Sequence, residues 1–170
     1  MNLPVQQKET TNPGRFTELN DVPSNVPDGG RIVALDPGTK RIGVAICDEL
    51  RFTTRPLELI ERESWKKLLL TVKNILAEYD AKALVIGLPL ESDGDESTMS
   101  AVARDMARKF SLSLDVPVYL QDERMTSYAA KSRLWDRGVD VKESRRLVDS
   151  EAAAIILSDF LDRVGRSMGR

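Results

Sequence analysis

Apolar residues occur in short runs over the first part of the chain. Two of these runs, Ile32–Leu35 and Ile42–Cys47, are separated by a short segment that contains Pro37 and Gly38. Apolar runs of this length, divided by turn-forming residues, predict two strands joined by a tight turn. We expect a weaker third strand near residues 55–59 and two further strands over 83–86 and 116–120.

A different spacing follows the third strand. Behind Ser64, a candidate N-cap, apolar residues recur every three or four positions from Trp65 to Leu76, which predicts a helix ending near Asp80. Similar patterns predict helices over residues 97–110, 126–137 and 144–163. Strands at the front followed by alternating helices and strands indicate an α/β fold: a mixed five-stranded sheet with helices on both faces.

The chain divides into three parts by composition. Residues 1–30 contain four prolines and no sustained apolar period, which is typical of a disordered or loosely packed leader. The patterned region, residues 31–165, is long enough for one domain, and residues 166–170 form a short tail. No internal repeat is visible in the patterned region.

Charge and composition exclude several classes of function. The 170 residues include 25 Lys and Arg against 27 Asp and Glu, so a global basic field that would recruit nucleic acid is absent. With no histidine and one cysteine, Cys/His zinc sites and Ser-His-Asp triads are excluded. The sequence shows neither a membrane-spanning run nor a signal peptide, and we expect a cytoplasmic protein that does not contact the membrane.

Acidic residues occupy three positions that favour chemistry. Asp36 and Glu123 each close an apolar strand, where functional groups of α/β sheets gather. Asp149 falls on the same side of the last helix as Ala153 and Ile156. Each position also has a purely structural interpretation: a turn residue at Asp36, a surface ion pair at Glu123 and a boundary residue at Asp149.

Three carboxylates from separate elements suit a hard divalent cation such as Mg²⁺ or Mn²⁺, which takes oxygen ligands. Two such ions would activate a water and stabilise the leaving oxygen at a phosphate. Phosphodiester hydrolysis is therefore the reaction that this set of residues favours.

Four short motifs resemble the YqgF (RuvX) family. In chain order they are Asp36–Ala45, Gly87–Leu90 with Asp93–Gly94, Asp122–Ser127, and Val148–Asp149 with Ala152–Ala153. The resemblance implies a ribonuclease H-like fold related to the RuvC Holliday-junction resolvases. It also implies a nuclease that matures the 5′ end of pre-16S ribosomal RNA, with Asp36, Glu123 and Asp149 as the acidic metal-binding set.

In this setting five basic residues become candidates for phosphate contacts, because each lies close to one of the carboxylates. They are Lys40, Arg41, Arg124, Arg145 and Arg146. Such contacts position a nucleic-acid backbone without reading its bases. Ordinary solvated charge is the alternative for each of them.

Other functions remain open on the sequence alone. One is resolution of branched DNA in recombination or repair, which requires a symmetric dimer. Another is a non-catalytic RNA-binding factor in ribosome assembly, and a third is nucleotide binding, because Asp36–Thr39 also fits the phosphate turn of actin-like folds. We expect precursor ribosomal RNA as the partner and a monomer or weak homodimer.

Overall fold

The computed structural model describes residues 16–17, 25–90, 96–123 and 141–168, with side chains described for 25–90, 96–123 and 150–165. A mixed sheet with the strand order β1-β6-β5-β2-β3-β4 forms its centre. The pairs β2–β3 and β3–β4 are antiparallel, whereas the pairs β2–β5, β5–β6 and β6–β1 are parallel. The strands are β1 (Phe16–Thr17), β2 (Ile32–Pro37), β3 (Arg41–Cys47), β4 (Thr54–Glu61), β5 (Ala83–Leu88) and β6 (Val118–Asp122).

The five strands expected from the sequence are all present, and a two-residue sixth strand joins them. This sixth strand, β1, comes from the leader and pairs with β6 at the edge of the sheet. Val26 is buried in the core, and the Tyr119 hydroxyl donates a hydrogen bond to the Asn25 carbonyl at 3.0 Å. Packed structure therefore begins upstream of Arg31, where the sequence placed the start of the domain.

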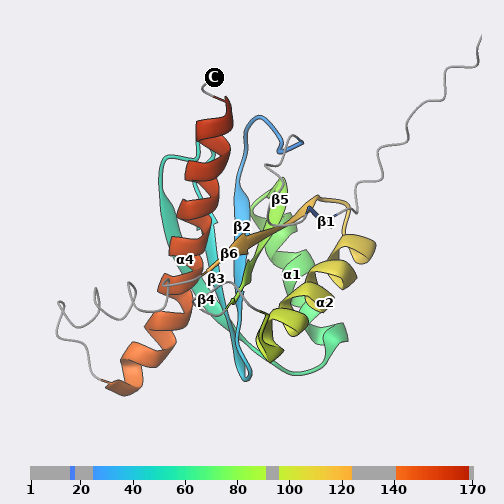
Figure 1. Ribbon diagram of the computed structural model, residues 1–170, viewed down its shortest axis with the longest axis vertical. Helices are drawn as coiled ribbons and strands as arrows, with labels where there is room; N and C mark the ends of the chain where they lie inside the picture. Colours follow the sequence, from blue (N-terminus) through green and yellow to red (C-terminus); the bar gives the residue numbers. More distant parts are fainter. Residues whose placement is uncertain (1–15, 18–24, 91–95, 124–140, 169–170) are drawn as a thin grey trace, which may run out of the picture.

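Helices cover both faces of the sheet, as predicted. On one face lie α1 (Trp65–Glu78) and α2 (Thr98–Ser113), and on the other lies the long helix α4 (Val141–Met168) (Figure 1). The last helix begins three residues earlier than the pattern indicated. The helix expected over residues 126–137 lies outside the described residues.

Local sequence explains why the two shorter helices begin where they do. The Ser64 hydroxyl accepts a hydrogen bond from the Lys67 N–H, which caps α1 as predicted. From there α1 buries Leu68, Val72 and Leu76, spaced four residues apart on one face. Ser97 caps α2 in the same way, and its own N–H bonds back to the Ser100 hydroxyl.

Alternate residues of the central strands belong to two different cores. In β2, Val33 and Leu35 pack toward α1 and α2, whereas Ile32 and Ala34 pack toward α4. This two-residue period follows from the pleat of the strands. Both faces of the central strands are therefore covered, which explains why all six residues of β5 are buried.

The two faces differ in the size of their side chains. On the α4 face the strands present three buried alanines, and α4 presents small residues in return. Small side chains on both partners allow a helix to approach a sheet closely. The alanines of the sheet are Ala34, Ala45 and Ala83, and those of the helix are Ala153 and Ala154.

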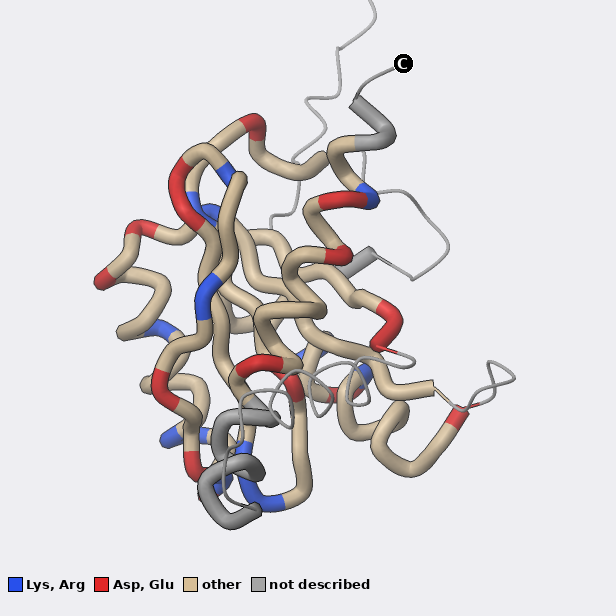
Figure 2. The backbone as a smooth tube through the Cα atoms, turned by 90° about the vertical axis from the view of Figure 1, so that its left-hand side faces the viewer, with Lys and Arg blue, Asp and Glu red and all other residues tan. Residues whose placement is uncertain are grey.

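Charged positions lie on the loops, the outer helix faces and the edge of the sheet, with both signs interspersed (Figure 2). This distribution agrees with the absence of a global basic field in the sequence. Among the helices of the described ranges, none has the length and apolar character needed to cross a membrane.

Candidate active site

Strand periodicity places the predicted acidic residues on one face of the sheet. Asp36 follows Ala34 by two positions, so both face α4. Glu123 lies one residue beyond β6 and four positions after Tyr119, so it falls on the same face of the sheet. Tyr119 packs in the core between the sheet and α4. The β2 and β6 strands are not neighbours, because β5 lies between them.

Asp36 and Glu123 nevertheless meet, and their carboxyl groups form a hydrogen bond. Two strand spacings separate the backbones of β2 and β6, about 10 Å, so the two side chains reach toward each other across β5. Burial, followed by the charge of Asp36 and this hydrogen bond, raises the pKa of Glu123 well above its ordinary value of 4.5. In the protein alone, this shift favours a protonated Glu123 carboxyl, whose O–H can donate to Asp36.

Gly87 on β5 creates the space in which this pair forms. A Cβ atom at Gly87 would lie 2.7 Å from Glu123 Oε2 and 2.6 Å from Ile156 Cδ1. Both distances are shorter than side-chain contacts allow, so Glu123 Oε2 and Ile156 Cδ1 would both have to move. Glycine at this position lets Glu123 pack directly over the β5 backbone.

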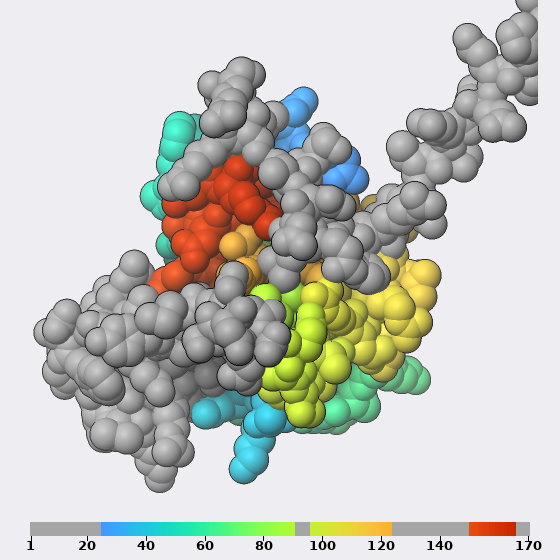
Figure 3. Space-filling model, viewed as in Figure 1, coloured from blue at the N-terminus to red at the C-terminus, as the bar shows by residue number. Residues whose placement is uncertain are grey.

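The third predicted carboxylate belongs to the helix that covers this pair. Ala153, Ile156 and Phe160 of α4 are fully buried against the sheet, as the predicted face requires. Asp149 precedes Ala153 by one helical turn, and its side chain lies outside the described ones. Figure 3 shows the red surface of α4 directly beside the orange surface of β6.

Among the basic candidates, Arg145 and Arg146 belong to α4 but have side chains outside the described ones, and Arg124 lies wholly outside the described residues.

The turn between β2 and β3 carries the other two basic candidates. Lys40 is exposed in this turn, and Arg41 is the first residue of β3 and is partly buried. The Gly38 N–H donates to the Arg41 carbonyl at 2.9 Å, and a Cβ on Gly38 would lie 2.5 Å from that oxygen. Only glycine therefore fits this close approach of the backbone to itself.

Arg62, which the sequence argument did not single out, ties this turn to the end of β4. Its guanidinium donates to the Gly38 carbonyl at 2.9 Å, and its backbone N–H donates to the Lys40 carbonyl at 2.9 Å. These contacts bring a third cation to the turn that follows Asp36. Nothing local in the sequence points to Arg62, because its partners are more than twenty positions away.

The chemistry of the acidic pair fits a divalent cation. Two carboxylates in contact carry excess negative charge once both are ionised, and a bound cation relieves it in place of the proton. Mg²⁺ takes carboxylate oxygens and is commonly held by one or two of them together with waters. Among the described side chains, no group of three His, Cys, Asp or Glu forms a metal site. Asp36 and Glu123 supply two ligands, and Asp149 remains the predicted third.

Sequence comparison decides the family. The model of the RuvX family, described as Holliday junction resolvase, matches residues 30–163. This chain belongs to the RuvX family. The matched residues span the described core from β2 into the last helix, which confirms the resemblance inferred from the four motifs.

Two similar bacterial proteins carry the same name. A protein of Anaeromyxobacter dehalogenans (strain 2CP-1), named "Putative pre-16S rRNA nuclease", is 40% identical over 133 residues, covering 78% of this chain and 97% of its own length. A protein of the same name from Thiobacillus denitrificans is 37% identical over 139 residues, covering 82% of this chain and 96% of its own length. The nuclease class expected from the motifs agrees with these names.

The fold also resembles a solved resolvase structure. The structure of Thermus thermophilus RuvC in complex with a Holliday junction substrate matches with a TM-score of 0.51 and 18% identity, covering 80% of this chain and 96% of that one. This likeness confirms the predicted ribonuclease H-like fold with a mixed sheet and helices on both faces.

Proposed function

We propose that this RuvX-family protein is a metal-dependent nuclease that hydrolyses phosphodiester bonds in precursor ribosomal RNA, maturing the 5′ end of pre-16S rRNA in the cytoplasm. The observation that carries the proposal is the hydrogen-bonded pair of Asp36 and Glu123, held on the α4 face beside the turn of Lys40 and Arg41. The names of the bacterial relatives support the substrate.

Asp36, Glu123 and Asp149 would hold Mg²⁺ or Mn²⁺, which would supply an activated water and charge stabilisation at the scissile phosphate. The chain itself would orient the substrate. Lys40 and Arg41 would contact backbone phosphates on one side of the acidic pair, and Arg124, Arg145 and Arg146 would extend that contact. Arg62 would fix the turn from which Lys40 projects.

Cleavage of a defined RNA tests this proposal. An end-labelled RNA spanning the 5′ junction of pre-16S rRNA is incubated with the wild type, Asp36→Asn or Glu123→Gln, in Mg²⁺ or EDTA. We expect cleavage by the wild type in Mg²⁺ and a loss of at least about 100-fold in both variants. Asp162→Asn, an exposed position on the same helix as Asp149, is the matched control and should cleave normally.

Two outcomes contradict the proposal. Equal cleavage by all proteins would indicate a contaminating nuclease, and tight RNA binding without cleavage by any of them would favour the non-catalytic assembly factor. A gel-shift measurement on the same RNA separates these outcomes, because the assembly factor binds RNA without metal and after Asp36 is neutralised.

Branched DNA is the second candidate substrate. The family description and the likeness to RuvC bound to a Holliday junction favour it. A resolvase nicks two strands symmetrically and acts as a two-fold dimer. Incubation with a labelled four-way junction, combined with sedimentation of the complex, therefore discriminates: paired nicks by a dimer support resolution, and a monomer that makes none contradicts it.

A further inference from the structure

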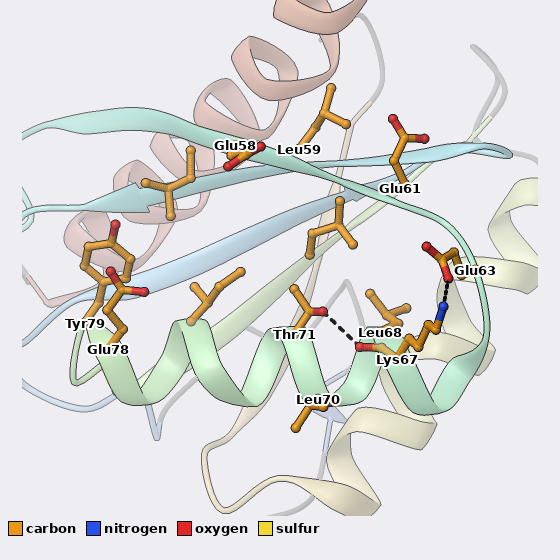
Figure 4. A pocket seen from close by; sticks show the side chains of 13 residues that line it. Glu58, Leu59, Glu61, Glu63, Lys67, Leu68, Leu70, Thr71, Glu78 and Tyr79 are labelled. Atoms are coloured by element: carbon orange, nitrogen blue, oxygen red, sulfur yellow. Dashed lines mark hydrogen bonds and ion pairs between the residues drawn. The ribbon is translucent and has the colours of Figure 1, made fainter.

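The edge strand β4 borders an open groove on the side of the sheet away from the acidic pair. The order of the sheet ends at β4, and no described strand pairs with its outer edge. Between this strand and α1 lies a groove of about 600 Å³, hereafter the β4–α1 groove (Figure 4). Long unpaired edges are uncommon in isolated domains, because their free backbone groups invite another strand.

The floor of the β4–α1 groove is apolar. Leu57 and Ile60 of β4 and Ile75 of α1 are partly buried against the core, next to the buried Leu68. Leu70 stands at its border with 60% of its surface exposed. A groove with this lining accepts apolar side chains from an occupant.

The rim of the groove is acidic. Glu58 and Glu61 of β4, Glu63 and Glu78 all line it and are exposed. Among the described residues that line the groove, Lys67 is the one cation, and it forms an ion pair with Glu63. An excess of negative charge repels nucleic acid and attracts a basic occupant.

The part of the edge that is open for pairing is short and well defined. The Leu57 carbonyl already accepts a hydrogen bond from the Ser150 hydroxyl of α4 at 3.0 Å. At the other end β4 finishes at Glu61, and the following Arg62 N–H donates to the Lys40 carbonyl on the β3 side of the strand. Residues 58–61 remain beyond the Leu57 contact, a stretch of about 13 Å that includes the register shift of β4 between Leu57 and Ile60.

A second copy of this chain fits the groove poorly. Two β4 strands paired around a two-fold axis would bring Glu58 and Glu61 of one copy close to the same residues of the other. Like charges facing each other across paired strands are destabilising. The occupant favoured by the charges is therefore a basic segment of another protein.

We propose that the β4–α1 groove binds an extended segment of a partner protein, in which basic side chains alternate with apolar ones, by adding it as a strand to the edge of β4. Backbone hydrogen bonds to residues 58–61 supply the pairing, and the alternating side chains meet the acidic rim and the apolar floor. The apolar floor of the groove lies on the α1 face, whereas the acidic pair lies on the α4 face.

A synthetic probe tests this docking site. A fluorescein-labelled peptide of alternating lysine and valine is titrated with the full chain at low salt, and anisotropy reports binding. We expect the double variant Glu58→Lys/Glu61→Lys to bind at least about tenfold more weakly than the wild type. Glu49→Lys/Asp162→Lys changes the net charge equally at exposed positions away from the groove and should bind like the wild type.

Hydrogen exchange separates strand addition from loose charge attraction. Bound peptide should slow exchange of the amides in residues 58–61, and a glutamate-valine peptide should not bind. Equal binding by both double variants, or no binding by the wild type, would overturn the proposal, as would protection of these amides by self-association without peptide. RNA cleavage by the single variant Glu58→Lys should be unchanged, so failure here is distinct from failure of the proposed nuclease.

Discussion

Glu123 forms a hydrogen bond with Asp36 across a strand that separates them, over a glycine that provides the space. The contact joins the end of β2, the first strand of the antiparallel β2–β3 hairpin, to the end of the parallel strand β6. It creates an acidic pair whose charge is balanced by a proton in the protein alone. The first two predictions follow from that balance.

Neutralising Glu123 should stabilise the protein in EDTA. Because burial and Asp36 raise the pKa of Glu123, folding favours its protonated form. The resulting stabilisation is complete below about pH 4.5 and is lost as pH rises through the raised folded pKa. Glutamine at position 123 still donates a hydrogen bond but does not titrate. We therefore expect the free energy of unfolding of Glu123→Gln near pH 8 to exceed that of the wild type by about 1–2 kcal/mol.

Thermal denaturation between pH 5 and pH 9 in EDTA measures this effect. The wild type should lose stability relative to Glu123→Gln as pH rises through this range. Parallel pH profiles for the two proteins would contradict the prediction.

Divalent cations should stabilise the wild type and not the acidic variants. A ligand that binds only the folded state at 100 times its dissociation constant adds about 2.7 kcal/mol. We therefore expect Mg²⁺ to raise the melting temperature of the wild type by several degrees and to leave Asp36→Asn and Glu123→Gln nearly unchanged. Asp162→Asn should respond like the wild type, and an equal response in all four proteins would place the cation elsewhere.

A side chain at Gly87 should disturb both catalysis and stability. The added methyl group of Gly87→Ala would displace the ends of two flexible side chains, Glu123 and Ile156. We expect RNA cleavage to fall by about 10- to 100-fold, because a small misplacement of a catalytic group is costly, and stability to fall by about 1–3 kcal/mol. Full activity in this variant would show that Glu123 tolerates the displacement.

Gly165→Ala is the matched control for that substitution. Gly165 lies in α4 with nothing within 4 Å of the position of a Cβ. Alanine should stabilise the helix there by about 0.5–1 kcal/mol and leave activity unchanged.

Removing the guanidinium of Arg62 should loosen the turn that follows Asp36. Arg62→Gln loses the hydrogen bond to the Gly38 carbonyl, and we expect a loss of about 1 kcal/mol in stability and a several-fold higher KM for RNA. Arg108→Gln removes an exposed guanidinium on α2 and should change neither quantity. A KM equal to that of the wild type would confine Arg62 to a structural role.

The strands, both ends of α1 and the family could be predicted from the sequence. Leu68, Val72 and Leu76 show their helical spacing without any knowledge of neighbours, and Ser64 marks the start of that helix. The continuous apolar residues of β2 and β5 likewise predict from the local sequence that these strands are buried. These features were predictable because they depend on residues close together in the chain.

Tertiary structure alone decided which distant residues meet. The sequence grouped Asp36 with Glu123 but did not show that they would bond over Gly87. It gave no sign that Arg62 would hold the turn at Gly38 or that the leader would add a strand beside β6. Each contact depends on the order of strands in the sheet and on the direction of side chains across it. That order is set by covering both faces of one sheet with helices, which is a property of the whole chain and of no single segment.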